Sequence, residues 1–190
     1  MPKVRVLRRR TIHTGRIFSV DREKIRLTNG RVVEMEIVRH RGSVVLVPQP
    51  TPTTVILIRQ YRHVIGRWIW ELPAGSLEPG EAPRRAARRE CEEEIGLTPR
   101  RLERLGRFYP TPGFCTEDMV FYRCLDLVAP TGPVAQDPDE QIRPRTFTLT
   151  DAWRLVARGG VVDMKTILGI DLVSSFNHLR ALRQRPSGLR

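Results

Sequence analysis

The chain has 190 residues, of which 40% are hydrophobic, so it is long and apolar enough for one folded domain with a small appendage and too apolar for a disordered protein. It carries 33 basic and 21 acidic residues, for a net charge of +12. Lys3, Lys24 and Lys165 are the lysines, so 33 less 3 leaves 30 arginines. These charges are scattered, which favours solubility over a nucleic-acid-binding track, and nucleic acid is not the expected partner.

Cysteine usage and hydropathy exclude several further classes. Three cysteines, an odd number without a CxxC pair, indicate neither a disulfide framework nor a zinc site. No apolar run approaches the roughly 20 residues of a membrane span, so no membrane partner is expected. The start, MPKVRVLRRR, lacks the apolar core of a signal peptide. We therefore expect a cytoplasmic protein.

The first 40 residues predict a small antiparallel β unit. Segments 3–8, 16–27 and 31–39 have the composition of strands, and Asn29-Gly30 between the last two is a strong hairpin signal. A unit of this size is too small and too polar to hold its own core. We expect residues 1–40 to form a subdomain that packs on the rest of the chain or on a second copy.

The remainder predicts strands around one central helix, with two helices at the end. The expected strands are 43–48, 54–60, 68–73, 102–107, 119–127 and 142–149. A helix over 83–95 follows a turn at Ala74-Gly75 and ends at Gly96, a suitable C-cap. Thr150 is expected to cap a short helix over 151–158, and Asp163 a longer one over 164–182. This order indicates an α+β fold with a mixed sheet.

The helix over 83–95 carries an unusual set of carboxylates. Glu90 and Glu94 lie one turn apart on one face, and Glu93 borders that face. Like charges at this spacing destabilise a helix unless arginines or a bound cation compensate. The opposite face is small and apolar, with Ala86, Ala87, Cys91 and Ile95. A solvated surface helix with salt bridges is the simpler alternative, but it leaves the flanking glycines unexplained.

This stretch resembles the Nudix box, G-x5-E-x7-R-E-U-x-E-E-x-G-U, where U is aliphatic. Cys91 departs from the pattern only in being a cysteine at a U position, and Leu97 fills the last U. The resemblance implies a Nudix α/β/α sandwich over 41–183, after the N-terminal antiparallel β subdomain and before a basic tail over 184–190. The fixed positions are met by Gly75, Glu81, Arg89, Glu90, Glu93, Glu94 and Gly96.

Further segments resemble the ADP-ribose pyrophosphatase branch of that family. They are the QYR segment at 60–62, the E-x-P-A-G turn at 71–75, Pro112 fifteen residues after Leu97, the acidic stretch QDPDEQI and the segment GVVDMKTIL. Thr111 and Cys115 stand where that branch commonly has serine. The branch implies hydrolysis of ADP-ribose to AMP and ribose 5-phosphate, in a homodimer that exchanges its N-terminal strands. Another nucleoside diphosphate sugar, a dinucleotide such as FAD or NADH, or a nucleic-acid-binding module of the same fold remain alternatives.

The resemblance also assigns roles to residues. It implies that Mg²⁺ or Mn²⁺ is held by Glu90, Glu93, Glu94 and the Ala74 carbonyl, with Glu81 as an occasional or supporting ligand. Arg89 would hold the glutamates in place. The general base would be Glu140, or Glu93 in its stead, although Glu140 could also be a solvated loop acid. Substrate contacts would come from Arg62, Glu117 and Ile17, and Arg62 could equally be a surface arginine.

Overall fold

The computed structural model describes residues 3–133 and 142–183, with side chains described as far as residue 175. Within these ranges, no helix is both long enough and apolar enough to cross a membrane.

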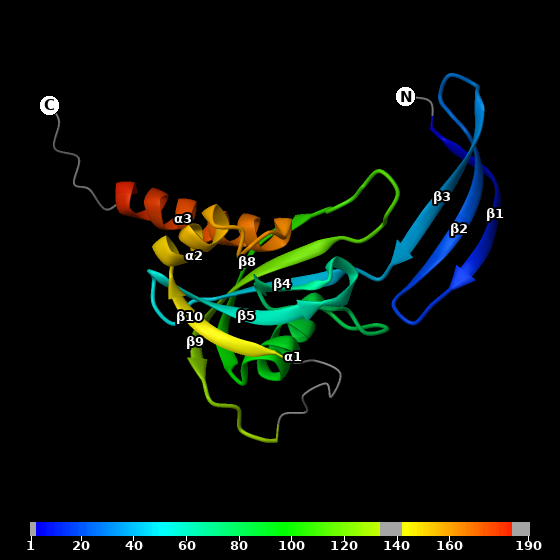
Figure 1. Ribbon diagram of the computed structural model, residues 1–190. Coiled ribbons are helices and arrows are strands. Elements are labelled where there is room, and N and C mark those ends of the chain that lie inside the picture. Colours follow the sequence, from blue (N-terminus) through cyan, green and yellow to red (C-terminus); the bar gives the residue numbers. More distant parts are fainter. Residues whose placement is uncertain (1–2, 134–141, 184–190) are drawn as a thin grey trace, which may run out of the picture.

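The first three strands form a separate antiparallel sheet that projects from the body of the molecule (Figure 1). They are β1 (Arg5–Thr14), β2 (Phe18–Arg26) and β3 (Val32–His40), in the order β1-β2-β3. The predicted turn at Asn29-Gly30 joins β2 to β3, with Gly30 at φ 85°. The end of β3 ties the sheet to the body, because Val38 donates to the Phe114 carbonyl and accepts from the Thr116 amide.

One face of this sheet carries three cross-strand pairs of like charge. Arg5 lies opposite Arg26, Arg8 opposite Lys24, and Arg10 opposite Arg22. All six side chains are exposed. We call this set the basic ladder. Like charges directly opposite each other destabilise a sheet. On the β3 side, Glu36 lies opposite Arg22, with an ion pair at 2.6 Å, and Glu34 lies opposite Lys24, so two acids offset part of the excess.

Two further sheets form the middle layer of the body. One has the order β7-β4-β9-β8, from β4 (Ser43–Pro48), β7 (Ala74–Ser76), β8 (Thr98–Phe108) and β9 (Met119–Val128), with β4 parallel to β9. The other has the order β10-β5-β6, from β5 (Thr54–Arg62), β6 (Arg67–Glu71) and β10 (Arg143–Thr148), with the 3-10 turn η1 (His63–Ile65) between β5 and β6. The mixed sheet that the sequence predicts is confirmed.

Helices cover both faces of this layer (Figure 1). On one side lies α1 (Pro83–Ile95), and on the other lie α2 (Leu149–Ala157) and α3 (Met164–Arg183). Successive residues of a strand point to opposite faces, so the apolar runs of β4 and β5 supply both cores. Val44, Leu46, Ile56 and Ile58 pack with Ala86, Ala87 and Cys91 of α1, whereas Val45, Val47, Val55 and Leu57 pack with Ala152, Ile170 and Val173 of α2 and α3. This arrangement is the predicted α/β/α sandwich.

The caps of α2 and α3 and the segment before α1 show how local bonds set the ends of elements. Thr148, not Thr150, caps α2, because its hydroxyl accepts from the Asp151 amide at 3.0 Å and Thr150 lies inside the helix. Asp163 caps α3 as predicted, accepting from the Thr166 amide at 3.0 Å. The segment Ala74–Ser76, predicted as a turn, is the short strand β7, which pairs with β4 through backbone atoms.

Candidate active site

Glu90 lies directly against the backbone of residue 75. A Cβ at Gly75 would stand 1.8 Å from Glu90 Oε1 and 2.0 Å from its Cδ. No side chain could fit there, so a glycine at residue 75 lets the carboxylate of α1 reach the backbone of β7. The first glycine of the sequence motif therefore has a steric explanation.

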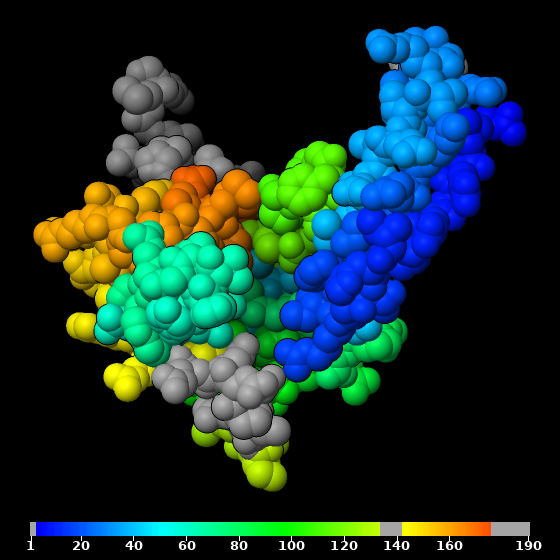
Figure 2. All heavy atoms as spheres, turned by 45° about the vertical axis from the view of Figure 1, so that its right-hand side comes forward, coloured from blue at the N-terminus to red at the C-terminus, as the bar shows by residue number. Residues whose placement is uncertain are grey.

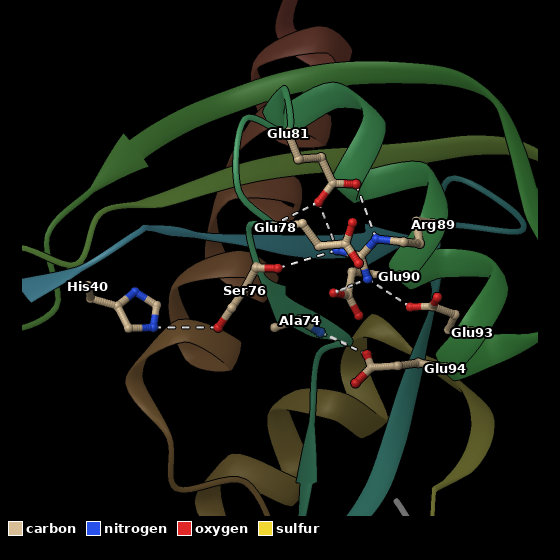
Figure 3. A network of polar contacts seen from close by, with 9 residues as sticks. All are labelled: His40, Ala74, Ser76, Glu78, Glu81, Arg89, Glu90, Glu93 and Glu94. Atoms are coloured by element: carbon tan, nitrogen blue, oxygen red, sulfur yellow. Dashed lines mark hydrogen bonds and ion pairs between the residues drawn. The ribbon is translucent and has the colours of Figure 1, made fainter. Parts of the chain in front are cut away.

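Arg89 is the centre of the polar network on α1 (Figure 3). Its Nη1 donates to Glu90 Oε1 and to Glu93 Oε2, each at 2.8 Å. Its Nε and Nη2 donate to the two carboxylate oxygens of Glu81 at 3.1 and 2.9 Å. The hydrogen bonds to Glu81, followed by the charge of Glu90, raise the pKa of Arg89 above its usual value. One guanidinium thus compensates the repulsion among three carboxylates.

Glu81 and Glu94 are fixed by backbone amides as well. The Glu81 carboxylate accepts from the Glu78 amide at 3.1 Å. Its pKa is lowered, mainly by the hydrogen bonds from Arg89 and also by this amide. Glu94 Oε2 accepts from the Ala74 amide at 2.8 Å, which joins the end of α1 to β7.

A cavity of about 410 Å³ opens at this junction of α1 and β7. Its size falls within the range of small-molecule sites. The wall formed by α1 and β7 contributes Ala74, Gly75, Ser76, Arg89, Glu90 and Glu93, and the loop after β7 contributes Leu77 and Glu78. The N-terminal sheet, which lies along one side of the body in Figure 2, supplies Arg16 and Ile17 from its first hairpin, and the link after the sheet supplies Arg41.

The oxygen atoms at this junction suit a hard divalent cation, which prefers carboxylate and carbonyl ligands. Glu81, Glu90, Glu93 and Glu94 are all gathered there, and Gly75 leaves the room that Glu90 needs. As the side chains stand, no three His, Cys, Asp or Glu residues of the described ranges form a cation site. Arg89 bonds one oxygen of Glu90 and one of Glu93, and Glu94 accepts from the Ala74 amide instead. The donor chemistry of these carboxylates fits a hard divalent cation.

Arg62, one of the expected substrate contacts, has a protein partner in the structure. Its Nε and Nη2 donate to the two oxygens of Glu71 at 2.6 and 3.0 Å. Glu71 is buried and also accepts from Lys165, which in turn pairs with Asp163 at 2.9 Å. Burial acts to raise the pKa of Glu71, but the hydrogen bond from Arg62 and the charge of Lys165 outweigh it and lower that pKa. Arg62 is not among the residues that line the 410 Å³ cavity, as far as the described ranges extend.

The other expected residues fall in different places. Ile17 lines the cavity. Glu117 accepts from the Ser43 hydroxyl at 2.9 Å, at the start of β4. Glu140 lies outside the described residues.

Sequence reasoning did not identify Arg16, Arg41 or Glu78 as cavity residues. Arg16 and Arg41 are separated in sequence from the helix motif and belong to no motif of their own, so the arrangement of the sheets alone brings them to the site. The sequence also did not predict that Glu71 is buried. A buried carboxylate needs charged partners, and Arg62 and Lys165 come from distant segments.

Comparison with known proteins gives consistent matches. A family model described as NUDIX domain matches residues 38–166. The chain is 35% identical over 161 residues to the ADP-ribose pyrophosphatase of Mycobacterium tuberculosis, covering 84% of this chain and 78% of that protein. It is 34% identical over 170 residues to the ADP-ribose pyrophosphatase of Bacillus subtilis, covering 90% and 92%. A crystal structure of an ADP compounds hydrolase superposes with a TM-score of 0.78 over 94% of this chain and 96% of that chain, at 22% identity.

Proposed function

The chain belongs to the Nudix family, and from that premise we propose that it hydrolyses the pyrophosphate bond of ADP-ribose to give AMP and ribose 5-phosphate. The observation that carries this proposal is the carboxylate cluster of α1, which Gly75 and Arg89 hold beside a ligand-sized cavity. The two pyrophosphatase relatives, each aligned over more than four-fifths of this chain, favour ADP-ribose as the substrate.

The carboxylates would hold Mg²⁺ or Mn²⁺ through Glu90, Glu93, Glu94 and the Ala74 carbonyl, with Glu81 in support. Bound there, such an ion supplies charge neutralisation for the pyrophosphate and acidifies a water molecule. Arg89 keeps the carboxylates oriented, since it contacts Glu81, Glu90 and Glu93 together. Ile17 would border the adenine, because it lines the same cavity.

The general base and the remaining substrate contacts belong to this proposal as well. We assign proton abstraction to Glu140, with Glu93 as the alternative. Glu140→Gln should then lower kcat far more than it raises KM, since a base acts in the transition state. A raised KM with kcat unchanged would make Glu140 a binding residue. Arg62 and Glu117 are retained as substrate contacts that would require rearrangement of their present bonds to Glu71 and Ser43.

We also propose a homodimer in which the first 40 residues cross to a second copy. The full length of β1 is exposed in the single chain, including the apolar residues Val6, Leu7 and Ile12. An unpaired strand edge with apolar side chains is an aggregation hazard, which a second copy would cover.

A substrate panel tests the proposed activity. ADP-ribose, ADP-glucose, GDP-mannose, NADH and FAD would be compared with Mg²⁺ and with Mn²⁺, and Glu90→Gln protein would serve as the control for contaminating activity. We expect kcat/KM for ADP-ribose to exceed every other value by at least about tenfold. A clear preference for another compound would move the assignment to a sister activity, and no turnover with either metal would contradict the proposal.

A further inference from the structure

We propose that Arg16 and Arg41 form an anion clamp that grips the pyrophosphate of the substrate from the side of the N-terminal sheet. The inference deepens the proposed function and rests on it for the identity of the substrate. The two arginines line the same cavity as Glu90 and Glu93 of α1. The cavity thus has one wall suited to a cation and another suited to an anion.

Arg16 is placed at the tip of the first hairpin. The Gly15 amide donates to the Phe18 carbonyl at 2.9 Å, and this bond leaves Arg16 and Ile17 as the two residues of the turn between them. Both turn residues line the cavity, so the hairpin reaches the site with its tip. Arg16 would therefore bind an anion beside the apolar contact that Ile17 offers to a base.

Arg41 lies in a link that is fixed on both sides. The Gly42 amide donates to His40 Nδ1 at 3.1 Å, and the Gly42 carbonyl accepts from the Leu77 amide at 3.0 Å. Gly42 has φ 95°, and a Cβ there would stand 2.7 Å from Asp118 Oδ1, so this backbone shape depends on glycine. The fixed link positions the base of the Arg41 side chain beside β7 before any ligand binds, which reduces the entropy cost of binding.

The charges around the two arginines favour an anion of more than one negative charge. In the described part of the chain, neither guanidinium has a hydrogen bond or an ion pair, whereas Arg89 in the same cavity makes several. Two cations in one cavity repel each other, and a ligand that carries negative charge relieves that repulsion. Guanidinium groups match phosphate oxygens in pairs. A diphosphate offers enough oxygens for both arginines and still leaves others for the wall of α1.

The clamp has a consequence that does not depend on metal. Without a cation, the carboxylates of Glu90 and Glu93 repel an anion, and the two arginines attract it. Removal of either arginine should weaken metal-free diphosphate binding, and neutralisation of Glu93 should not. The opposite effects of the arginine variants and Glu93→Gln on metal-free binding thus distinguish residues of the clamp from residues of the proposed metal site.

The test is calorimetric titration of the full-length protein with inorganic pyrophosphate, ADP and inorganic phosphate in the presence of EDTA. The variants are Arg16→Gln, Arg41→Gln, the double variant, Arg41→Lys and Glu93→Gln. Arg104→Gln is the matched control, because it removes one exposed positive charge from β8, at the edge of its sheet remote from β7. Thermal melting of each variant checks that the fold is kept.

We expect Arg16→Gln and Arg41→Gln each to raise the Kd for pyrophosphate about tenfold or more, as loss of a charge-assisted contact should. Arg41→Lys should be intermediate, and Arg104→Gln should stay within about twofold of wild type. Glu93→Gln should bind pyrophosphate at least as tightly as wild type, and phosphate should bind more weakly than pyrophosphate. Unchanged Kd values in both arginine variants, or no pyrophosphate binding to wild type at millimolar concentration, would overturn the clamp.

The same variants distinguish the clamp from the proposed activity. With Mg²⁺, Arg41→Gln should raise KM for ADP-ribose with a smaller effect on kcat. If wild type binds pyrophosphate through both arginines but does not hydrolyse ADP-ribose, the clamp stands and the activity fails. If ADP-ribose is hydrolysed while both variants keep wild-type KM and Kd, the activity stands and the clamp fails.

Discussion

The carboxylate of Glu90 occupies the space that a side chain at residue 75 would need. The sequence pattern marks both residues, but a pattern of spacing cannot say that they touch. The same limit applies to Arg16 and Arg41, which reach the cavity from other segments and match no motif. At the scale of single residues, the helix motif was therefore predictable from sequence, and the rest of the cavity wall was not.

Gly75→Ala should abolish most activity while the protein still folds. The added methyl group would overlap Glu90 Oε1, so the carboxylate must move. A displacement of about 1 Å at a reacting site can cost about 100-fold in rate, and overpacking costs about 1–3 kcal/mol of stability. Steady-state kinetics and thermal melting measure the two effects. Gly132→Ala is the control, because a Cβ there meets no atom of the described residues within 4 Å, and equal activity in both variants would contradict the steric argument.

Glu90→Gln and Glu94→Gln should each lose most activity without loss of fold. Each change removes a charged oxygen from the proposed cation site, and glutamine can still accept the hydrogen bond from the Ala74 amide at residue 94. Glu92→Gln is a matched control on the same helix, since Glu92 bonds the Thr98 hydroxyl, whereas Glu94 bonds the Ala74 amide of β7. A fall in kcat of less than about tenfold, or ~1.4 kcal/mol, in both test variants would remove the metal assignment.

Elements with strong local signals were predicted well. The helix predicted over 83–95 is α1, and the strands predicted at 43–48 and 119–127 are β4 and nearly all of β9. β1 extends to Thr14 rather than to residue 8, because the run from Arg8 to Thr14 lacks apolar alternation and is a strand through its pairing with β2. β8 likewise begins at Thr98 rather than at residue 102, because its polar start pairs with the end of β9. Strand ends that depend on a partner carry little signal in their own sequence.

The contact of β6 with α3 shows the same dependence on tertiary structure. Glu71 ends β6, Lys165 lies in the first turn of α3, and Arg62 ends β5. Glu71 and Lys165 are 94 residues apart, so no local pattern predicts their contact. The segments that resemble the pyrophosphatase branch supply all three residues, and in the structure these residues form one ion cluster.

Glu71→Gln should destabilise the protein by about 3 kcal/mol at pH 7, the usual cost of breaking a buried ion pair. The effect should also depend on pH. The pKa of Glu71 is lower in the folded state than its unfolded-state value of about 4.5. The stability that its ionised form contributes is therefore complete above about pH 4.5 and is lost as pH falls through the folded-state pKa. Urea unfolding at pH 7 and near pH 3 measures both effects. The difference in free energy of unfolding between wild type and Glu71→Gln should be smaller near pH 3 than at pH 7. A larger difference near pH 3 would contradict a stabilising, ionised Glu71.

The whole molecule consists of a sandwich that carries the carboxylates and a sheet that projects from one side of it (Figure 1). The sequence predicted both the sandwich and the N-terminal antiparallel sheet. It could not predict that the tip of the first hairpin lines the cavity, because that contact depends on how the sheet is set on the body by β3 and residues 114–116.

Deletion of residues 1–40 should greatly weaken ADP-ribose binding although the carboxylate helix remains. The truncated chain loses Arg16 and Ile17 from the cavity and, in our proposal, the dimer contacts. We expect a monomer or an aggregate with a raised KM. Light scattering paired with kinetics tests this, and a well-folded monomer with unchanged KM would show that the opening segment is an independent appendage.

The basic ladder has a consequence for how fast an anion arrives. Six exposed cations outnumber Glu34 and Glu36 on the same face, so the sheet has a positive field that extends about 10 Å into solution at 0.1 M salt. This sheet also carries the hairpin whose tip lines the cavity, so the field lies beside the entrance that an anionic substrate must find. Electrostatic steering of this kind increases encounter rates and fades as ionic strength rises. We therefore expect a diphosphate to associate with the cavity faster at low salt than at high salt, since the cations of the basic ladder attract it before any contact is made.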